Sequence, residues 1–363
     1  MDKLFRIFTS TLLAAAPPQV AAQAPTKAQP IVLSSSCAGE QRSLDEAAFV
    51  PIGEISQWIT IKGGSCANPI VLVIHGGPGN PNTPYADAIF GSWTKDFTVV
   101  QWDQRGAGKT YAANRPSEDQ PLTIKQMTRD GVEVTRYLTA RLGKRKVILM
   151  GSSWGSALAV HMTKAEPGLF HAYLGTGQLV GGYKNLNSSY RRVLPRARAG
   201  GDRDTVRALE AIGPPPWINP RAFGVLRRAT RRYEAPKTDP APSEWWRSAV
   251  GYDSPSYRAD YEAGEEYSYL QFVGLTGGGI LSQLDLYKLG PSFEMPVFLI
   301  HGEEDLVTTP EVAKAYFDSV KAPRKAFILL ARTGHDPNQT MIGAQLSILK
   351  TRVRAEAMAF DEQ

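Results

Sequence analysis

Ser153 stands at the centre of the run Gly151-Ser152-Ser153-Trp154-Gly155, between an apolar stretch and a helix-prone segment. Here a short buried strand is expected to end, the chain to reverse sharply and a helix to begin. Such a turn forces the central serine into a strained backbone conformation. Such a turn tolerates little side-chain bulk, which explains a glycine two positions before and two positions after the serine. The hydroxyl would then lie at the positive end of the helix, beside N–H groups without an intrahelical partner. The pattern predicts a nucleophile.

A serine hydroxyl is a weak nucleophile until a base takes its proton, and the base needs a carboxylate to orient it. His335 is expected in a loop beyond a strand, from which it can reach the carboxyl edge of a sheet. The other four histidines suit structural roles, since two end strands, one lies in the helix after Ser153 and one begins a strand. The acid is expected in the loop after the strand at 297–300, where we prefer Asp305 and keep Glu304 as the alternative.

A glycine-rich segment, His75-Gly76-Gly77-Pro78-Gly79, directly follows an apolar run. Glycines at the end of a strand let backbone N–H groups face a ligand without obstruction. We predict that the N–H groups of Gly77 and Trp154 form an oxyanion hole, each worth about 3 kcal/mol in the transition state. Without Ser153 the same segment would indicate no more than a turn.

Short apolar runs, typical of parallel strands buried on both faces, indicate the sheet that must position these residues. They lie at 70–74, 97–100, 147–150, 297–300 and 327–330. Ahead of them, the alternating residues 47–52 and 55–61 predict an antiparallel hairpin. Helices are predicted at 124–142, 310–320 and 341–359.

The buried-strand pattern disappears between Gly181 and Gly290, and we predict a helical cap there. Its charge is segregated, with 11 basic and 3 acidic residues from Arg191 to Arg232, and 3 basic and 9 acidic residues from Glu234 to Asp285. A one-sided distribution creates a field, and its acidic half can attract a cationic substrate group. A solvated surface that binds no ligand is the alternative.

Residues 1–24 are predicted to be a secretory signal, because Lys3 and Arg6 precede the ten-residue apolar stretch 7–16 and small residues follow. That stretch is too short to span a bilayer. We therefore expect a secreted or periplasmic protein without stable membrane insertion once the signal is removed. An uncleaved amphipathic tail is the alternative.

Export to an oxidising compartment predicts a disulfide between the two cysteines, Cys37 and Cys66. Closing a loop of about thirty residues contributes ~3 to 4 kcal/mol in the chain-entropy model. The predicted organisation is a signal peptide (1–24), a linker (25–46), a core in two parts (47–180 and 291–363) and the cap (181–290).

At 363 residues, with 42% hydrophobic and 21% charged residues, the chain can bury a large core. The length suits one large α/β domain with an insertion, or two domains. The net charge of +6 is modest and scattered, so it does not indicate nucleic-acid binding. The expected partner is a small molecule or a short peptide.

Five ordered signals resemble the proline iminopeptidase-like serine peptidases of the α/β-hydrolase superfamily. They are residues 75–79, 103–108, 151–156, 302–305 and 334–335. The resemblance implies an eight-stranded, mostly parallel sheet with a helical cap after the sixth strand. It also implies an enzyme that cleaves an N-terminal residue from peptides and needs neither a cofactor nor a metal. It also implies that 103–108 is a structural loop, in which Arg105 bonds neighbouring backbone or acids.

In that family, cap glutamates bind the α-ammonium of the substrate, and one of them belongs to a Trp-Glu pair. Here the nearest stretch is Trp245-Trp246-Arg247, with arginine where an acid is expected, and Glu266 resembles the second glutamate loosely. Asp260 is a further candidate for the ammonium. We predict that the substrate-binding residues are Trp245, Trp246, Glu265 and Glu266.

The expected function is that of an exported aminopeptidase with a Ser-His-Asp triad. A carboxylesterase, lactonase or amidase on the same fold is the alternative, favoured by Arg247 and by an aromatic-rich cap that suits a bulky apolar group. A binding protein that keeps the fold without turnover is a third hypothesis, which the complete set of chemical groups disfavours.

Overall fold

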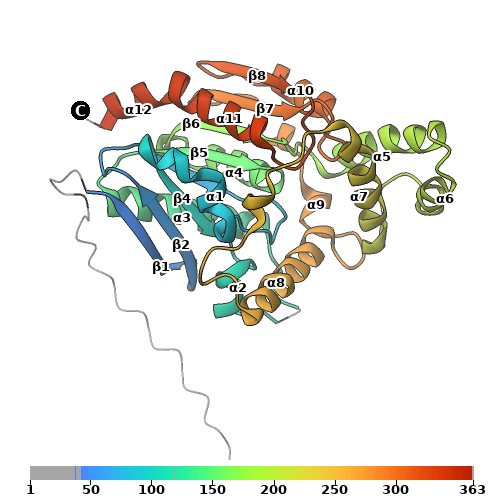
Figure 1. Cartoon of the computed structure of the whole chain (residues 1–363), viewed down its shortest axis with the longest axis horizontal. Helices are drawn as coiled ribbons and strands as arrows, with labels where there is room; N and C mark the ends of the chain where they lie inside the picture. The colour runs from blue at the N-terminus through green and yellow to red at the C-terminus, as the bar shows by residue number, and fades with distance from the viewer. Residues whose placement is uncertain (1–36, 38–41, 118, 362–363) are drawn as a thin grey trace, which may run out of the picture. The chain divides into compact units, whose positions relative to one another are not determined.

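The structure, a computed structural model, describes Cys37, residues 42–117 and residues 119–361. The predicted signal peptide lies outside the described residues. A single sheet has the strand order β1-β2-β4-β3-β5-β6-β7-β8 (Figure 1). Its strands are β1 (Leu44–Ile52), β2 (Ile55–Gly63), β3 (Ile70–Ile74), β4 (Thr98–Asp103), β5 (Val147–Ser152), β6 (Phe170–Thr176), β7 (Val297–Gly302) and β8 (Lys325–Leu330).

Strand β2 pairs antiparallel with β1 and with β4, and every other pair of neighbours is parallel. The predicted hairpin is therefore confirmed, and so is the predicted eight-stranded, mostly parallel sheet. Parallel strands end at a common edge, so the loops after β3, β5 and β7 and the loop after β8 all emerge there.

Side chains of the central strands alternate between two apolar clusters, as the two-residue period of a strand requires. Ile70, Leu72 and Ile74 of β3 belong to one cluster, and Val71 and Val73 belong to the other. Helices α3 (Ile124–Leu142), α4 (Trp154–Ala165) and α10 (Pro310–Ser319) contribute to the first cluster. Helices α1 (Ala86–Phe90), α11 (Gln339–Ile348) and α12 (Arg354–Asp361) contribute to the second. Both faces of the sheet are thus covered by helices.

Helix α3 shows how local sequence sets an element's ends. The Thr123 side chain accepts a hydrogen bond from the N–H of Gln126 and caps the first turn. Gly143, with φ 63°, ends the helix in the left-handed conformation that glycine adopts most readily. The helix therefore spans the residues that the sequence predicts.

The remaining short elements of the core are η1 (Thr83–Tyr85), η2 (Gly91–Lys95), α2 (Gly108–Ala113) and η3 (Pro167–Leu169). The predicted last helix is continuous through a π-helical turn, η7 (Leu349–Val353), which joins α11 to α12. The disulfide predicted between Cys37 and Cys66 is present, with the two Cα atoms 5.5 Å apart.

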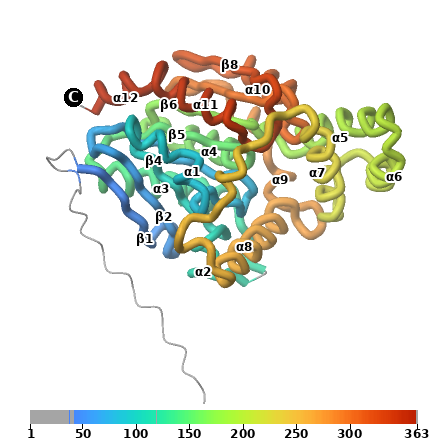
Figure 2. Tube along the Cα trace, in the orientation of Figure 1, coloured from blue at the N-terminus to red at the C-terminus, as the bar shows by residue number. Residues whose placement is uncertain are grey.

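Residues 181–290, all of them described, form helices and no strand apart from an isolated bridge between Gly181 and Asp285. In Figure 2 the helices α5, α6 and α7 lie together, α8 lies largely apart from them, and α9 lies between the two and contacts both α5 and α8. The elements are α5 (Gly182–Ala199), α6 (Arg203–Ile212), α7 (Pro220–Glu234), η4 (Ala235–Lys237), η5 (Ser243–Trp246), α8 (Pro255–Val273), α9 (Ile280–Gln283) and η6 (Leu286–Leu289). Of the helices in the described part of the chain, none has both the length and the apolar character to cross a membrane.

Candidate active site

Ser153 occupies the turn between β5 and α4 with φ 52° and ψ −122°. A positive φ is uncommon for a residue with a side chain, so this backbone is strained. A Cβ atom at Gly151 would come within 2.4 Å of the Gly155 carbonyl oxygen, and one at Gly155 within 2.1 Å of the Ile74 carbonyl oxygen. The turn therefore packs against its own helix and against β3 so closely that only glycine fits on either side of Ser153.

Three side chains from different loops meet at this turn. His335 lies in the loop after β8, and its Nε2 atom is 3.0 Å from Ser153 Oγ. Its Nδ1 atom is 3.0 Å from Asp305 Oδ2, in the loop after β7. In this arrangement the serine hydroxyl donates to Nε2, and the Nδ1 proton is donated to the carboxylate. The structure thus brings together the residues that the sequence predicts as nucleophile, base and acid.

The Asp305 carboxylate is fully buried and accepts hydrogen bonds on both oxygens. The N–H groups of Val307 and Thr308 each lie 2.8 Å from Oδ1, and the Thr308 hydroxyl lies 2.6 Å from Oδ2. Burial alone would raise the pKa of Asp305, but the charge of His335 with its hydrogen bond, together with the nearby imidazole of His301, outweighs burial and holds that pKa well below its usual range. Asp305 is therefore ionised at neutral pH.

Burial and Asp305 act on His335 in opposite directions. Burial lowers the pKa of His335, and the charge of Asp305 with its hydrogen bond more than offsets burial, so the pKa lies above its ordinary value. Glu304, the alternative acid, forms ion pairs with two cap residues instead, with Oε2 3.5 Å from Arg196 Nη2 and 3.8 Å from Lys237 Nζ.

The four other histidines do not reach Ser153, although His301 has an unforeseen contact. Burial lowers the pKa of His75 to about 4, and its ring lies 2.8 Å from the Gly76 carbonyl oxygen through Nδ1. Burial likewise lowers the pKa values of His161 and His171 to about 4. His301 is buried with Nε2 3.3 Å from Asp305 Oδ2, so it adds a second imidazole beside the carboxylate.

The predicted oxyanion hole lies at the junction of two loops. Within the described part of the chain, the N–H groups of Gly77 and Trp154 have no hydrogen-bond partner, which leaves both available to a ligand. Gln104 fixes the two loops relative to each other: its Nε2 donates to the His75 carbonyl oxygen at 3.0 Å, and its Oε1 accepts from the Trp154 indole at 3.0 Å. Gln104 lies in the 103–108 motif, but nothing in the sequence indicates this bridging role.

Arg105 has the role that the resemblance implies. Its Nε donates to Asp130 Oδ2 at 2.8 Å, and Nη2 donates to the Gly53 carbonyl oxygen at 2.6 Å. These bonds tie the loop after β4 to α3 and to the β1–β2 turn. Residues 103–108 are thus a structural loop beside the site.

Glu234, at the end of α7, is a residue that the sequence analysis missed. Its side chain is buried, and its Oε1 accepts from the N–H of Leu306 at 2.6 Å. Its Oε2 accepts from the N–H of His335 at 3.3 Å. Burial raises the pKa of Glu234, and the nearby Asp305 charge raises it further. One carboxylate of the cap therefore joins the loops that carry Asp305 and His335.

The signal for Glu234 was in the sequence. Tyr233-Glu234 is an aromatic residue followed by glutamate, the residue types of the family's Trp-Glu pair, and it precedes Trp245-Trp246-Arg247, the stretch compared with that pair above. Nothing local to α7 indicates that the glutamate would contact residues 72 and 101 positions later.

A cavity of about 860 Å³ opens onto Ser153 and His335, with Gly77 on its wall. Of the predicted substrate contacts, Trp246, Glu265 and Glu266 line this cavity, and Glu262 joins them. Within the part of the chain that the structure describes, no group of three or more histidine, cysteine or carboxylate side chains is placed to hold a metal ion.

Two residues considered for substrate binding, Trp245 and Asp260, do not line this cavity. Trp245 is buried in the apolar cluster that contains Met341 and does not line the cavity. Adjacent residues of a 3₁₀ turn point about 120° apart, so the two neighbouring tryptophans of η5 face different surroundings. Asp260 forms an ion pair with Arg115 and also lies outside the cavity lining.

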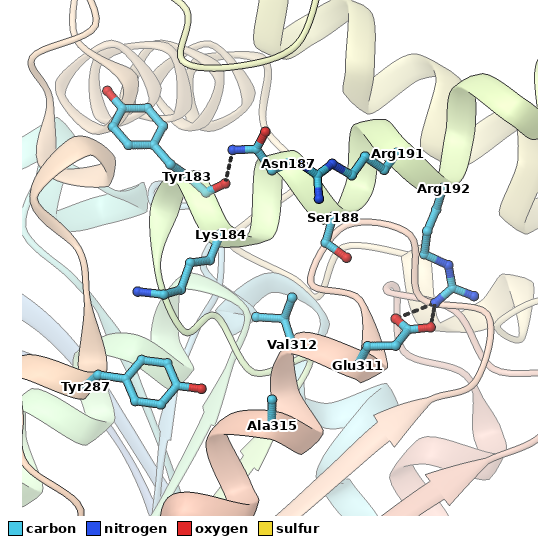
Figure 3. Close-up of a pocket in the computed structure, with 10 residues that line it drawn as sticks. All are labelled: Tyr183, Lys184, Asn187, Ser188, Arg191, Arg192, Tyr287, Glu311, Val312 and Ala315. Atoms are coloured by element: carbon cyan, nitrogen blue, oxygen red, sulfur yellow. Dashed lines mark hydrogen bonds and ion pairs between the residues drawn. The ribbon is translucent and has the colours of Figure 1, made fainter.

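A second pocket of about 660 Å³ lies between α5 and α10 (Figure 3). It shares no lining residue with the cavity at Ser153. Its charged groups are largely paired, since Arg192 Nη1 lies 2.7 Å from each Glu311 carboxylate oxygen and Lys184 Nζ lies 3.0 Å from Asp285 Oδ2. The candidate active site is therefore the cavity at Ser153.

Known proteins share this architecture. The profile of the Alpha/beta hydrolase family matches residues 70–343. The probable aminopeptidase YbaC of Bacillus subtilis (strain 168) is 27% identical over 305 residues, which are 82% of this chain and 93% of that protein. The solved structure of VinJ aligns with a TM-score of 0.60 and 18% identity, over 85% of this chain and 98% of that chain.

The solved structure of the proline iminopeptidase of Mycobacterium smegmatis aligns with a TM-score of 0.58 and 19% identity, over 88% of this chain and 98% of that chain. At such identities the two structural alignments show a shared fold. The sequence match to the Bacillus protein extends over most of both chains, so it includes the cap as well as the sheet.

Proposed function

The chain belongs to the alpha/beta hydrolase family, and from that membership we propose that Ser153, His335 and Asp305 form the catalytic triad of an aminopeptidase acting on short peptides. The contacts that run from Ser153 Oγ to His335 and from His335 to Asp305, each 3.0 Å long, carry the proposal. The match to a probable aminopeptidase supports the choice of an amide substrate with a free N-terminus.

The geometry supports the following reaction. Ser153 Oγ attacks the carbonyl carbon of the scissile amide while its proton passes to His335 Nε2. The N–H groups of Gly77 and Trp154 donate to the oxyanion of the tetrahedral intermediate. Asp305 stabilises the imidazolium, which then gives its proton to the leaving nitrogen as the C–N bond breaks.

The acyl-enzyme is resolved by the same groups. His335 takes a proton from water, and the resulting hydroxide attacks the acyl carbon to form a second tetrahedral intermediate at the same oxyanion hole. Collapse of this intermediate breaks the ester bond, and Ser153 Oγ recovers its proton from His335. No cofactor is required at any step.

The free α-ammonium of the substrate is assigned to the acidic residues on the α8 wall. Glu262, Glu265 and Glu266 fall on one face of α8, as the three- and four-residue spacing of a helix allows, and all three line the cavity. Three carboxylates on one wall of a partly enclosed cavity favour a cationic group.

A carboxylesterase or amidase acting on a bulky apolar acyl group is the second candidate. It is favoured by the aromatic side chains on the cavity wall, among them Phe223, Trp246 and Phe272. Such a substrate would use the same triad and would not need the glutamates of α8.

Three substrate types distinguish the two candidates. Amino-acid anilides with a free amine, the same anilides with a blocked amine, and simple aryl esters are assayed with purified protein. The aminopeptidase proposal predicts cleavage of the free-amine anilides and at least tenfold weaker cleavage of the blocked ones. Equal or better cleavage of blocked anilides and esters would favour the esterase instead.

Substitution of the acids gives a matched control. E265Q and E266Q are expected to raise KM for free-amine anilides with a smaller effect on kcat, because they weaken binding without touching the triad. E244Q is the control, since Glu244 is an exposed cap acid that does not line the cavity.

We also propose that the protein is exported, as the N-terminal sequence and the disulfide between Cys37 and Cys66 suggest. Expression of the full chain in a bacterial host, followed by fractionation and mass analysis, tests export. A protein shortened by about the predicted signal and found outside the cytoplasm is the expected result. A full-length cytoplasmic protein would contradict it.

A further inference from the structure

The cavity at Ser153 has cap walls of opposite charge. Helix α8 contributes Glu262, Glu265 and Glu266, and helix α7 contributes Arg227 and Arg231. The two arginines are four residues apart, which places them on one face of α7. The proposed ammonium site accounts for the acidic wall, and nothing in the proposed reaction accounts for the basic wall.

The acidic wall and the basic wall lie beside different loops of the proposed active site. Helix α8 lies against the loop that carries Gly77, because a Cβ atom at Gly79 would come within 2.8 Å of Glu265 Cα. Arg227 lies at the histidine loop, with Nη2 3.0 Å from Oδ1 of Asp336, the residue after His335. The acidic wall thus belongs to the oxyanion side of the site, and the basic wall belongs to the His335 side.

The proposed reaction places different parts of the substrate on these two sides. His335 must protonate the leaving amine, so the leaving part of the substrate lies on the His335 side. For an aminopeptidase, the α-ammonium belongs to the acyl part and the C-terminal carboxylate belongs to the leaving part. When the substrate is only two or three residues long, that carboxylate lies close to the scissile bond, since an extended chain spans at most about 3.6 Å per residue.

We propose that Arg231, assisted by Arg227, binds the C-terminal carboxylate of a di- or tripeptide, so that the enzyme selects short peptides with a free C-terminus. This inference rests on the proposed aminopeptidase function. Arg231 is exposed to solvent and has no acidic partner within the described part of the chain, whereas Arg227 is already paired with Asp336. A guanidinium binds a carboxylate through two parallel N–H donors, which makes arginine suited to the role.

The test compares peptides that differ only in the C-terminal charge. X is the residue that the free-amine anilide assay shows to be cleaved best. Cleavage of X-Ala and X-Ala-Ala is measured beside cleavage of the same peptides with a C-terminal amide. The free acids are expected to have a kcat/KM at least tenfold higher, the effect of about one charge-assisted contact.

Two variants of α7 test whether Arg231 causes the preference for free acids over amides. R231Q is expected to bring the acid-to-amide ratio close to one, mainly through a higher KM for the acids. R228Q is the matched control, since Arg228 is the exposed neighbour of Arg227 on α7 and does not line the cavity, and it should keep the wild-type ratio. Cleavage of the X anilide by R231Q shows that the variant is folded.

Equal rates for acids and amides in the wild type, or an unchanged acid-to-amide ratio in R231Q, would overturn the inference. The proposed aminopeptidase function would not be affected by either result. If no free-amine anilide is cleaved at all, the proposed function fails, and the inference fails with it. The two failures therefore give different results.

Discussion

At the scale of single residues, Asp305 determines how the site responds to pH. Its carboxylate accepts bonds from two backbone N–H groups, the Thr308 hydroxyl and His335 Nδ1. Because this carboxylate stays ionised, its charge raises the pKa of His335 against the effect of burial. His335 accepts the Ser153 proton only in its neutral form, so activity should rise with pH through the pKa of this histidine.

The pH profile of kcat/KM is the first prediction. Its acid limb should have a midpoint above about 6.5, the ordinary histidine value, since the pKa of His335 is raised. D305N removes the charge that offsets burial, so the limb should move to lower pH and kcat should fall by about 10⁴. A wild-type limb at or below pH 6.5, or a limb unmoved in D305N, would contradict the geometry.

The three residues of the proposed triad could be predicted from the sequence because each has a local signal. Ser153 lies between Gly151 and Gly155, where the turn packs too closely for a Cβ atom, and Asp305 and His335 each follow an apolar run that forms a strand. The contact of His301 with Asp305 has no such signal, although the two residues are only four positions apart. His301 was expected to be structural because it ends a strand, and only the structure shows its ring beside Asp305.

At the scale of elements, α7 does more than cover the sheet. Its last residue, Glu234, accepts from the backbone of the Asp305 loop and from that of the His335 loop. The two loops also bond directly, since the Glu304 N–H donates to the Thr333 carbonyl oxygen at 3.0 Å. The cap thus helps to hold the Asp305 loop and the His335 loop together.

The second prediction concerns Glu234 as a positioning residue. E234Q keeps one acceptor but presents an NH₂ group to the second backbone N–H, so the loops should separate slightly. Small displacements of catalytic groups cost up to about 10²-fold in rate, and we expect kcat to fall at least tenfold with little change in KM. E234A should lose more activity than E234Q.

E244Q again serves as the control for Glu234. Equal kcat values for E234Q and E244Q would refute the positioning role. A rise in KM confined to free-amine substrates would instead indicate that Glu234 binds the ammonium. The split between kcat and KM therefore distinguishes the two roles.

Elements with strong local patterns were predictable, and contacts of the cap were not. Helix α3 has the Thr123 cap and the Gly143 stop, and its ends agree with the prediction. In η5 the adjacent residues Trp245 and Trp246 have the same chemistry, and only the three-dimensional turn separates a buried ring from one that lines the cavity. Residue type alone could not decide between them.

At the scale of the whole molecule, the disulfide between Cys37 and Cys66 fastens the chain ahead of β1 to the segment after β2. The closed loop has a sequence separation of 29 residues. A loop of that length restricts the unfolded chain and contributes ~3 to 4 kcal/mol in the chain-entropy model. The pairing was predictable because the sequence offers only two cysteines.

The third prediction is that the double variant C37S/C66S has a free energy of unfolding about 3 kcal/mol below that of the oxidised wild type. Urea unfolding followed by tryptophan fluorescence measures the difference. The reduced wild type should resemble the variant, while kcat stays unchanged, since neither cysteine lines the cavity at Ser153. Two free thiols in the unreduced, folded protein would contradict the disulfide.

The most direct test of the central claim is the reaction of the folded protein with a fluorophosphonate, followed by peptide mass mapping. The proposed triad predicts a single adduct on the peptide that contains Ser153, with hydrolysis lost in proportion to labelling and no adduct in S153A. Absence of an adduct on Ser153 in protein that hydrolyses its substrate, or an adduct on another serine that tracks the loss of activity, would contradict the account.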